Sequence, residues 1–219
     1  METFAILATA AFLGSLHALE PDHLAAVGAF TVRRPHPVAA LGFGARWALG
    51  HGGIIVVAGA LILAIGQTIP DSANHLLERI VGLTLIGLGV WTVAGRRYLH
   101  THAHNLDGDA PVVHIHAHAR PYQGAGSRNA PTMIGALHGL AGTAPALALV
   151  PATQLASPAL TLIYLLVFAI GTAAGMSLFA LLAGSLAHRA AGRSLQLARA
   201  LSVIAGIATI SIGFYWMIR

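Results

Sequence analysis

Four protonatable side chains lie within seven residues of one apolar segment near the start of the chain. The segment reads His17-Ala-Leu-Glu20-Pro21-Asp22-His23. Each charged side chain near the centre of a bilayer costs about 2.5–3.5 kcal/mol on insertion scales, so such a cluster needs a compensating role. Imidazole and carboxylate together suit a divalent ion such as Ni²⁺, Co²⁺ or Zn²⁺. We therefore predict a metal site on His17, Glu20, Asp22 and His23, with a hydrogen-bonded helix break and a proton relay as the alternatives.

The geometry of this predicted site depends on Pro21. On a straight helix with about 3.6 residues per turn, His17 and Asp22 would lie about 140° apart, and His17 and His23 about 240° apart. The Pro21 ring clashes with the carbonyl of His17, four residues earlier, and proline donates no backbone hydrogen bond. We therefore expect the helix to kink or break there, which would free the His17 carbonyl and bring Asp22 and His23 toward His17.

A further candidate ligand stands among glycines, in the sequence Gly50-His51-Gly52-Gly53. The residues around it are apolar, and glycine lets another backbone approach closely. A lone buried histidine is more often a hydrogen-bonded core residue than a ligand. Beside the first cluster, however, we predict that His51 binds the same ion.

A third group of histidines lies in a polar stretch that contains the sequences HTHAH and HIHAH. In an extended chain alternate side chains share one face, so each triplet can present three imidazoles together. Tracts of this kind are typical of metal binding, and a solvated polar linker is the alternative. The predicted accessory metal ligands are His100, His102, His104, His114, His116 and His118.

The composition defines the elements that must position these residues. Of 219 residues, 56% are hydrophobic and 9% are charged, and the mean hydropathy is +0.74. Soluble globular domains carry about 25% charged residues, so this composition excludes a disordered protein, a nucleic-acid binder and an ordinary cytosolic enzyme. The chain has no cysteine, which excludes thiolate metal sites and dithiol relays. We predict an all-α polytopic membrane protein whose partners are the lipid bilayer and a divalent transition-metal ion; self-association into a homo-oligomer is left open.

Six windows are long and apolar enough to cross a bilayer, since a spanning helix needs about 20 residues. The N-terminal run has no Lys or Arg before it, so we expect a retained first span and no cleaved signal peptide. The windows are approximately 4–30, 38–67, 76–95, 131–150, 159–187 and 195–218.

Arginine supplies all 12 basic residues and divides the loops by charge. Two of them, Arg79 and Arg219, fall on one side of the predicted membrane, and the other ten fall on the opposite side. Cytoplasmic loops carry the excess of positive charge, so we predict that both termini lie outside and that the His-rich loop 96–130 is cytoplasmic. The ten are Arg33, Arg34, Arg46, Arg96, Arg97, Arg120, Arg128, Arg189, Arg193 and Arg199.

An internal repeat relates the two halves of the chain. GSLHAL at 14–19 matches GALHGL at 135–140, and ALG at 48–50 matches AIG at 169–171, both at an offset of 121. At an offset of 120, Leu77 and Arg79 meet Leu197 and Arg199. We predict two three-helix repeats, 1–95 and 131–219, on either side of the loop, and chance similarity is the alternative.

Because three spans is an odd number, the second copy must insert upside down, which is typical of secondary transporters. His138 is the counterpart of His17, and we predict it as a metal ligand or gate; the alternative is a vestige. The acids of the first copy have no counterpart in the second, since Glu20 and Asp22 correspond to Ala141 and Thr143.

The pattern His17-x-x-x-x-Asp22-His23, within the wider stretch 16–27, resembles the signature of the nickel/cobalt transporter family (the NiCoT/NicO superfamily). The stretch 46–52, which ends in His51-Gly52, resembles that family's second patch. The resemblance implies that His17, Asp22, His23 and His51 handle the metal. Typical uptake members have eight spans where we count six, and the His-rich loop is more similar to the efflux branch.

We therefore predict a transporter of Ni²⁺ or Co²⁺ in the cytoplasmic membrane that works by alternating access, with Zn²⁺ as an alternative cargo. We expect no enzymatic activity and no tightly bound cofactor. The chain has no phosphate-binding Gly-x-x-x-x-Gly-Lys motif, so energy would come from an ion gradient, the membrane potential or a partner. The alternatives are an exporter of a small anion, a membrane-anchored metal buffer and a membrane enzyme; the first is disfavoured because the span centres lack arginine.

Overall fold

The apolar runs of the sequence form helices, because a helix satisfies every backbone hydrogen bond within one segment where no water is available. The computed structural model describes residues 2–33, 35–66, 70–95, 99–104, 112–117, 126–141, 148, 152, 155 and 157–218. In chain order its helices are α1 (Glu2–His17), α2 (Pro21–Arg33), α3 (Pro37–Ile65), α4 (Asp71–Gly95), α5 (Gly126–Gly139), α7 (Pro158–Arg193) and α8 (Leu195–Ile218). The strands β1 (Leu99–His104) and β2 (Val112–Ala117) stand between α4 and α5.

Among the described residues, four helices are each long and apolar enough to cross a membrane: α3, α4, α7 and α8. The pair α1 and α2 passes the same test together, although the two helices are bent by 56° at the break between them. The window predicted at 131–150 falls partly on α5, which ends at Gly139, and partly on residues outside the described ranges. The prediction of a helical, multi-span membrane protein is confirmed.

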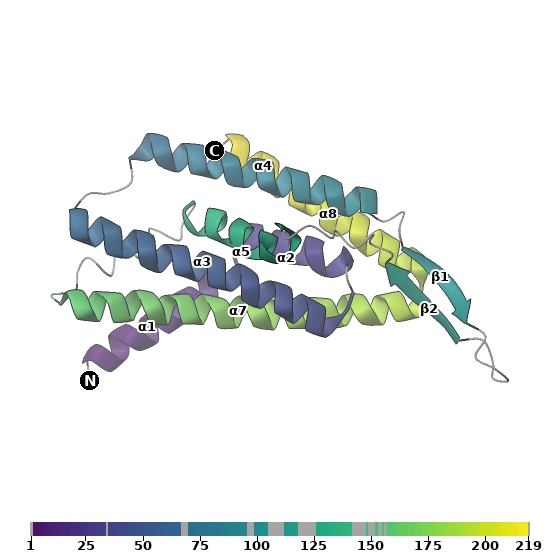
Figure 1. The fold of residues 1–219 in the computed structure, drawn as a ribbon, viewed down its shortest axis with the longest axis horizontal. Helices are drawn as coiled ribbons and strands as arrows, with labels where there is room; N and C mark the ends of the chain where they lie inside the picture. Colours follow the sequence, from purple (N-terminus) through teal and green to yellow (C-terminus); the bar gives the residue numbers. More distant parts are fainter. Residues whose placement is uncertain are drawn as a thin grey trace.

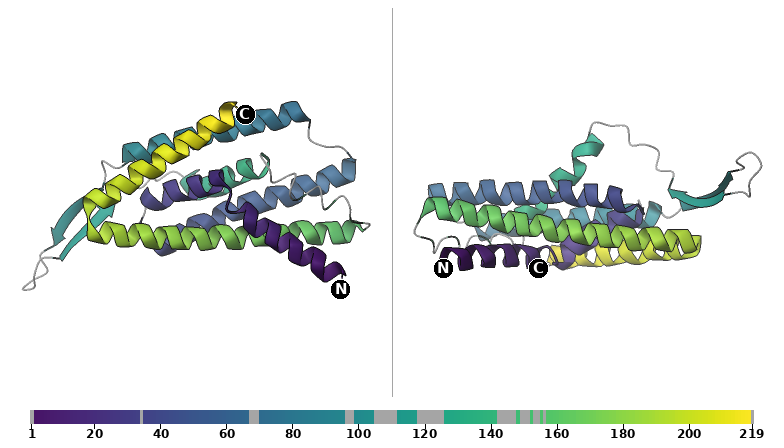
Figure 2. Two further views of the ribbon diagram at one scale, coloured as in Figure 1. Left: turned by 180° about the vertical axis from the view of Figure 1, so that it is seen from behind. Right: turned by 90° about the horizontal axis from the view of Figure 1, so that it is seen from below.

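The long helices lie in two antiparallel pairs, α3 beside α7 and α4 beside α8 (Figure 1). Two shorter helices, α2 and α5, lie between these pairs, and α1 crosses α7 at an angle (Figure 2). In the sequence, α2 follows α1 directly. In space, α2 packs most on α8 and also on α7 and α4, whereas α1 packs on α7.

Glycines set the closest of these helix crossings. Where α1 meets α7, and where α5 meets α3, one glycine on each helix faces a backbone carbonyl of the other. A Cβ atom at any of these four glycines would overlap that carbonyl, so no larger residue fits without a shift of the helices. The contacts are Gly14 with Phe168, Gly171 with Ala11, Gly135 with Trp47 and Gly50 with Thr132.

Apolar side chains cover the outside of the bundle and polar ones lie within it. Phe4, Leu49 and Ile170 are each two-thirds or more exposed, as befits side chains that face lipid tails. The interior holds buried threonines, such as Thr92 and Thr209, together with the histidines described below. This reversal of the pattern of a soluble protein is expected for a bundle surrounded by a bilayer.

The strands depart from the entirely helical fold that we predicted. β1 and β2 pair antiparallel in a two-stranded ribbon that projects past the ends of the helices (Figure 1). The segment is polar and lies outside the apolar windows, so nothing requires it to be helical. Its strands also alternate histidine with β-branched residues such as Thr101 and Ile115, which favour extended backbone.

Candidate metal centre

The chain changes direction between α1 and α2 through two tight turns. The backbone N–H of Leu19 donates to the carbonyl of Leu16 at 2.9 Å, and that of Glu20 donates to the carbonyl of His17 at 3.1 Å. Pro21 is the first residue of α2, a position at which the missing N–H of proline costs nothing. The prediction that the break would free the His17 carbonyl is therefore wrong, because this carbonyl accepts a hydrogen bond from the backbone N–H of Glu20.

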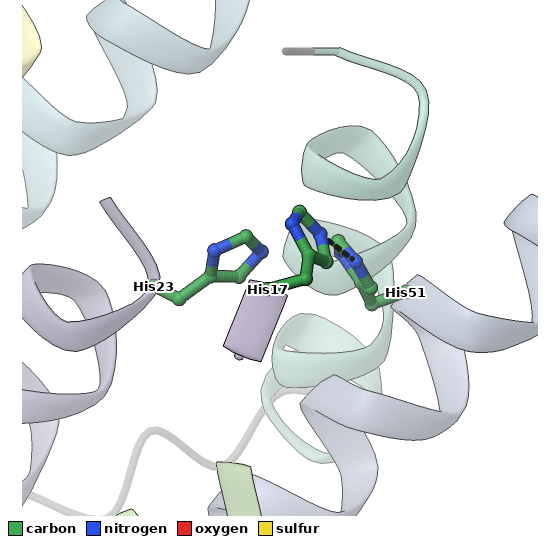
Figure 3. A group of neighbouring side chains, drawn as sticks. All are labelled: His17, His23 and His51. Carbon is green, nitrogen blue, oxygen red and sulfur yellow. Dashed lines mark hydrogen bonds between the residues drawn. The ribbon is translucent and has the colours of Figure 1, made fainter. Parts of the chain in front are cut away.

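The break brings three imidazoles together from three helices. His17 is the last residue of α1, His23 lies in the first turn of α2, and His51 comes from the middle of α3. Their ring centroids are 4.7 Å apart for His17 and His23, 5.1 Å for His17 and His51, and 4.8 Å for His23 and His51. In Figure 3 the rings of His23 and His51 lie on opposite sides of the His17 ring.

The nitrogen atoms of these rings are spaced as ligands of one ion. One nitrogen from each of the three rings lies within 4.8 Å of the others, and all three side chains are buried. The Nε2 atoms of His17 and His51 are 3.0 Å apart. Zinc–imidazole bonds are about 2.0–2.1 Å long, so two nitrogens on one such ion lie about 3 Å apart. The His17–His51 pair therefore already has the separation that a shared metal ion requires.

Two carboxylates lie beside the Nδ1 atoms of His17 and His23. Glu20 Oε1 lies 2.9 Å from His17 Nδ1, and Asp22 Oδ1 lies 3.1 Å from His23 Nδ1. A carboxylate on Nδ1 favours the tautomer whose Nε2 lone pair is free for a metal, and it fixes the orientation of the ring. The buried Asp22 and the partly exposed Glu20 thus prepare His17 and His23 to bind through Nε2.

The same carboxylates form a second group of three ligand atoms with His23. Atoms from Glu20, Asp22 and His23 also lie within 4.8 Å of one another. His23 therefore belongs to two ligand groups, which we name the imidazole set (His17, His23 and His51) and the carboxylate set (Glu20, Asp22 and His23). Nε2 of His23 is buried and makes no hydrogen bond within the described part of the chain.

The end of α5 packs against the backbone of α3 at His51. A Cβ atom at Gly139 would lie 2.6 Å from the carbonyl oxygen of His51 and 2.5 Å from the Cγ2 atom of Ile54. Only a glycine lets the end of α5 lie this close to α3. The approach also carries His138, the residue before Gly139, toward the cluster.

His138 lies at the edge of the cluster and belongs to neither ligand group. Its ring centroid is 6.2 Å from that of His23, and its Nδ1 lies 3.0 Å from the carbonyl oxygen of Ile134. An Nδ1–H that donates to this carbonyl leaves the lone pair on Nε2. That Nε2 is buried and has no hydrogen-bond partner among the residues that the structure describes.

Two aromatic residues that the sequence analysis did not single out as site residues line the centre. The Phe168 ring lies 5.8 Å from that of His17, and the Trp47 ring lies 4.7 Å from that of His138. Both side chains are fully buried, so they exclude water from the histidines. The sequence signal for them was available, because Trp47 and Phe168 are separated by the repeat offset of 121.

The histidines of the loop occupy paired positions of the ribbon. His100 stands opposite His116 and His102 opposite His114, whereas His104 stands opposite Val112. Directly paired residues share a face of a two-stranded ribbon, so five histidine positions fall on one face. The sixth predicted ligand, His118, lies outside the described residues. The sequence had predicted a face within each triplet but not the pairing between them.

Together, the fold and the site define a polytopic membrane protein with a buried histidine–carboxylate centre at a broken helix. The chain belongs to the family described as the cytochrome c biogenesis protein transmembrane region, which matches residues 6–208. No solved structure matches the chain.

Three relatives point to more particular roles. The chain is 27% identical to the urease accessory protein UreH of Bacillus sp. (strain TB-90), over 99% of this chain and 92% of that protein. It is 32% identical to a protein of Methanocaldococcus jannaschii named as a candidate nickel/cobalt efflux system, over 48% of this chain and 50% of that protein. It is also 27% identical to the Arabidopsis thaliana chloroplast protein FOR GROWTH AND FERTILITY 1, over 91% of this chain and 55% of that protein.

These relatives agree with two predictions from the sequence. The resemblance to the nickel/cobalt transporters is confirmed, since a protein named for nickel/cobalt efflux is similar over half of each chain. The prediction that the chain is no enzyme agrees with names that describe accessory or efflux proteins and no catalyst.

Proposed function

We propose that this protein carries Ni²⁺ or Co²⁺ across the cytoplasmic membrane, with His17, His23 and His51 as the ligands of the buried ion and Asp22 as the negative charge beside them. The observation that supports this most is the convergence of three buried imidazoles from three helices, with two Nε2 atoms 3.0 Å apart. A relative named for nickel/cobalt efflux and another named as a urease accessory protein favour the same cargo.

The chemistry of the cluster suits a borderline divalent ion. Neutral imidazole nitrogens bind nickel, copper, iron and zinc well, whereas all-oxygen sites suit magnesium and calcium. Asp22 adds a negative charge where a dehydrated cation has lost its water, and an unpaired charge in that environment is costly. Zn²⁺ remains an alternative cargo because the ligand types are the same. A dithiol relay is not available to this chain, which has no cysteine.

We further propose that the chain has six spans in two inverted repeats and works by alternating access. Three matched pairs of contacts support this arrangement. Each contact of the first crossing has a counterpart in the second when 121 is added to the α1 residue and subtracted from the α7 residue. The three pairs are Gly14–Phe168 with Gly135–Trp47, Ala11–Gly171 with Thr132–Gly50, and Ala18–Gly175 with Gly139–Ile54. The contacts of the α1–α7 crossing are therefore repeated at the α5–α3 crossing, residue by residue.

The α4–α8 crossing is also symmetric, at a slightly different offset. Gly82 faces the carbonyl of Gly213, and Gly89 faces the carbonyl of Gly206. Adding 124 to the α4 residue and subtracting 124 from the α8 residue converts each of these contacts into the other. The sequence match at Leu77 and Arg79 had predicted an offset of 120 for these two helices. A shift of about one helical turn keeps the same face of α8 toward α4.

We propose that both termini lie outside and that the ribbon between α4 and α5 lies in the cytoplasm. The ten-to-two division of arginine supports this orientation. A cysteine introduced at Asp109 should resist an impermeant thiol reagent added to intact cells and react once the cells are opened. The native chain offers no competing thiol. Labelling from outside would contradict the topology.

We propose that the ribbon histidines bind metal at the cytoplasmic mouth in an accessory role. The pairing of His100 with His116 and of His102 with His114 supports this role. A two-stranded ribbon outside the bundle does not enclose an ion as a set of packed helices does, so it suits capture and exchange rather than the dehydrated step.

Sealed proteoliposomes test the proposed transport directly. Purified protein should move Ni²⁺ and Co²⁺ across the bilayer, and Asp22→Asn should lower the flux by about 100-fold or more, since removing a full charge a few ångströms from the ion costs several kcal/mol. Asp71→Asn, at the first residue of α4, is the matched control and should transport normally. Wild-type protein that binds metal without moving it would favour a membrane-anchored buffer instead.

A further inference from the structure

Two ligand sets meet at His23, and we propose that they are successive positions of the transported ion. In the first position the imidazole set, His17, His23 and His51, holds the ion. In the second position the carboxylate set, Glu20, Asp22 and His23, holds it, so that His23 belongs to the ligands of both positions. This inference rests on the proposed metal transport and adds how the ion leaves the buried site.

The packing of the helices divides the ligands between two groups. α1 lies on α7, α7 on α3, and α3 on α5, and we call these four helices the α7 group. α2 packs most on α8, and to a smaller and similar extent on α4 and α7. Because α4 and α8 pack closely on each other, we place α2 with them and call these three helices the α8 group. His17 and His51 belong to the α7 group, whereas Asp22 and His23 belong to the α8 group.

Two threonine hydroxyls of the α8 group contact the backbone of α2. Each donates to a carbonyl of its own helix at 2.7 Å and lies farther from an α2 carbonyl oxygen, 3.2 Å for Thr209 to Ala25 and 3.4 Å for Thr92 to Ala29. Between the groups the contacts include apolar surfaces, for example the Phe30 and Phe43 rings stacked with centroids 3.7 Å apart. Stacked rings can slide past one another without leaving a hydrogen bond unmade, so the boundary between the groups suits a relative movement.

The two ligand sets respond differently to such a movement. The imidazole set takes its ligands from both groups, so parting the groups separates His23 from His17 and His51. The carboxylate set needs only α2 and the residue just before it, and it survives the movement. Glu20 stands in the break itself, and its side chain is 22% exposed where those of His17 and His23 are 1% and 2% exposed. The carboxylate set is therefore the less buried of the two.

Charge favours this order of events. Ligating imidazoles are neutral, so in the first position the double charge of the ion is balanced only from beyond the rings, by Asp22 and Glu20. Glu20 and Asp22 together neutralise a divalent ion, which lowers the cost of moving it out of the helix bundle. A carboxylate oxygen of Glu20 lies 2.9 Å from His17 Nδ1. In the proposed transfer this carboxylate moves away from the ring and binds the ion.

The test separates binding from flux with one pair of variants. Glu20→Gln keeps a side chain of the same size beside His17 Nδ1 but removes the charge. Glu78→Gln is the matched control, because Glu78 likewise lies three residues after a histidine, with a carboxylate oxygen 3.4 Å from His75 Nδ1. Ni²⁺ binding to purified protein is measured by titration calorimetry, and Ni²⁺ flux is measured in proteoliposomes.

We expect Glu20→Gln to bind Ni²⁺ about tenfold more weakly, as for the loss of an outer partner of a ligand, and to lose at least a further tenfold in flux at saturating Ni²⁺, because Glu20 contacts the ion directly only in the second position. Glu78→Gln should match wild type in both measurements. Wild-type flux in Glu20→Gln would overturn the transfer. An equal loss of binding and flux would also overturn it, since Glu20 would then merely orient His17.

A cross-link provides an independent test that does not depend on Glu20. Cysteines at Phe30 and Phe43 join the two groups through a short bismaleimide, whereas cysteines at Ala25 and Thr209 join helices within the α8 group. Linking the first pair should stop flux and leave Ni²⁺ binding intact, and linking the second pair should leave both intact. Full flux after linking Phe30→Cys to Phe43→Cys would overturn the parting of the groups. A failure of the proposed function itself would look different, because wild-type protein would then move no Ni²⁺.

Discussion

The crossing of α1 with α7 and the crossing of α5 with α3 have the same backbone contacts but carry different side chains beyond them. In each, two glycines face carbonyl groups of the partner helix, and an aromatic residue of the long helix lies over a histidine of the short one. In the first crossing the ring of Phe168 lies beside that of His17, and in the second the ring of Trp47 lies beside that of His138.

The chain that follows each histidine differs sharply. After His17 come Glu20, Asp22 and His23, all within ligand distance of one another. The second crossing has Ala141 at the position of Glu20, and the sequence from His138 to residue 219 contains no acid. Packing and chemistry are thus separable in this fold, because one crossing retains the architecture with a single buried histidine at the edge of the site.

Replacing the two equivalent histidines should give unequal losses, and this is the largest effect that the comparison predicts. His17→Gln removes a ligand of the imidazole set, so Ni²⁺ flux should fall by about 100-fold or more, given that losing only an outer partner of a metal ligand costs about 10–100-fold. His138→Gln should lower flux by less than about tenfold, the smallest loss given for an outer partner, because His138 belongs to neither ligand set and its ring centroid lies 6.2 Å from that of His23. Flux in proteoliposomes measures both, at matched amounts of reconstituted protein. Equal losses would place His138 in the same role as His17.

Replacing the equivalent glycines should instead give equal losses. An added Cβ at Gly14 or Gly135 meets a backbone carbonyl, and overpacking of this kind costs about 1–3 kcal/mol. Thermal unfolding in detergent should show a similar drop in the midpoint for Gly14→Ala and Gly135→Ala. Gly28→Ala is the control, since no atom lies within 4 Å of its added Cβ. A large drop at only one of the two would show that the crossings are not built alike.

The smallest effect should come from the ribbon. Replacing all six histidines of HTHAH and HIHAH by alanine should shift the Ni²⁺ concentration for half-maximal flux by a few fold and leave the maximal flux within about twofold, since the proposed accessory role leaves the dehydrated step to the buried site. The flux curve against Ni²⁺ concentration gives both values. Loss of maximal flux would move the essential site from the break to the ribbon.

Much of the site could be predicted because its ligands lie close together in the sequence. His17, Asp22 and His23 fall within seven residues, and Pro21 indicated that a straight helix would not persist there. The sequence did not show that Pro21 begins a second helix at an angle of 56°, nor that the Glu20 backbone occupies the His17 carbonyl, because both depend on the packing of α2 against α8.

The parts that could not be predicted arise from contacts between distant segments. His51 was recognised by its glycines, but its 3.0 Å contact with His17 depends on how α1 and α3 pack around α7, and its close support comes from Gly139. The ribbon register that places His100 opposite His116 likewise follows from strand pairing, which residue spacing within either triplet does not specify.

X-ray absorption of Co²⁺ bound to the variant without ribbon histidines tests the central claim most directly. With His100, His102, His104, His114, His116 and His118 replaced, the account predicts that one Co²⁺ still binds and that its spectrum shows about three imidazole ligands. Adding His51→Gln should remove one of them. A Co²⁺ ion surrounded only by oxygen in the first variant, or a spectrum unchanged by His51→Gln, would contradict a buried site formed by His17, His23 and His51.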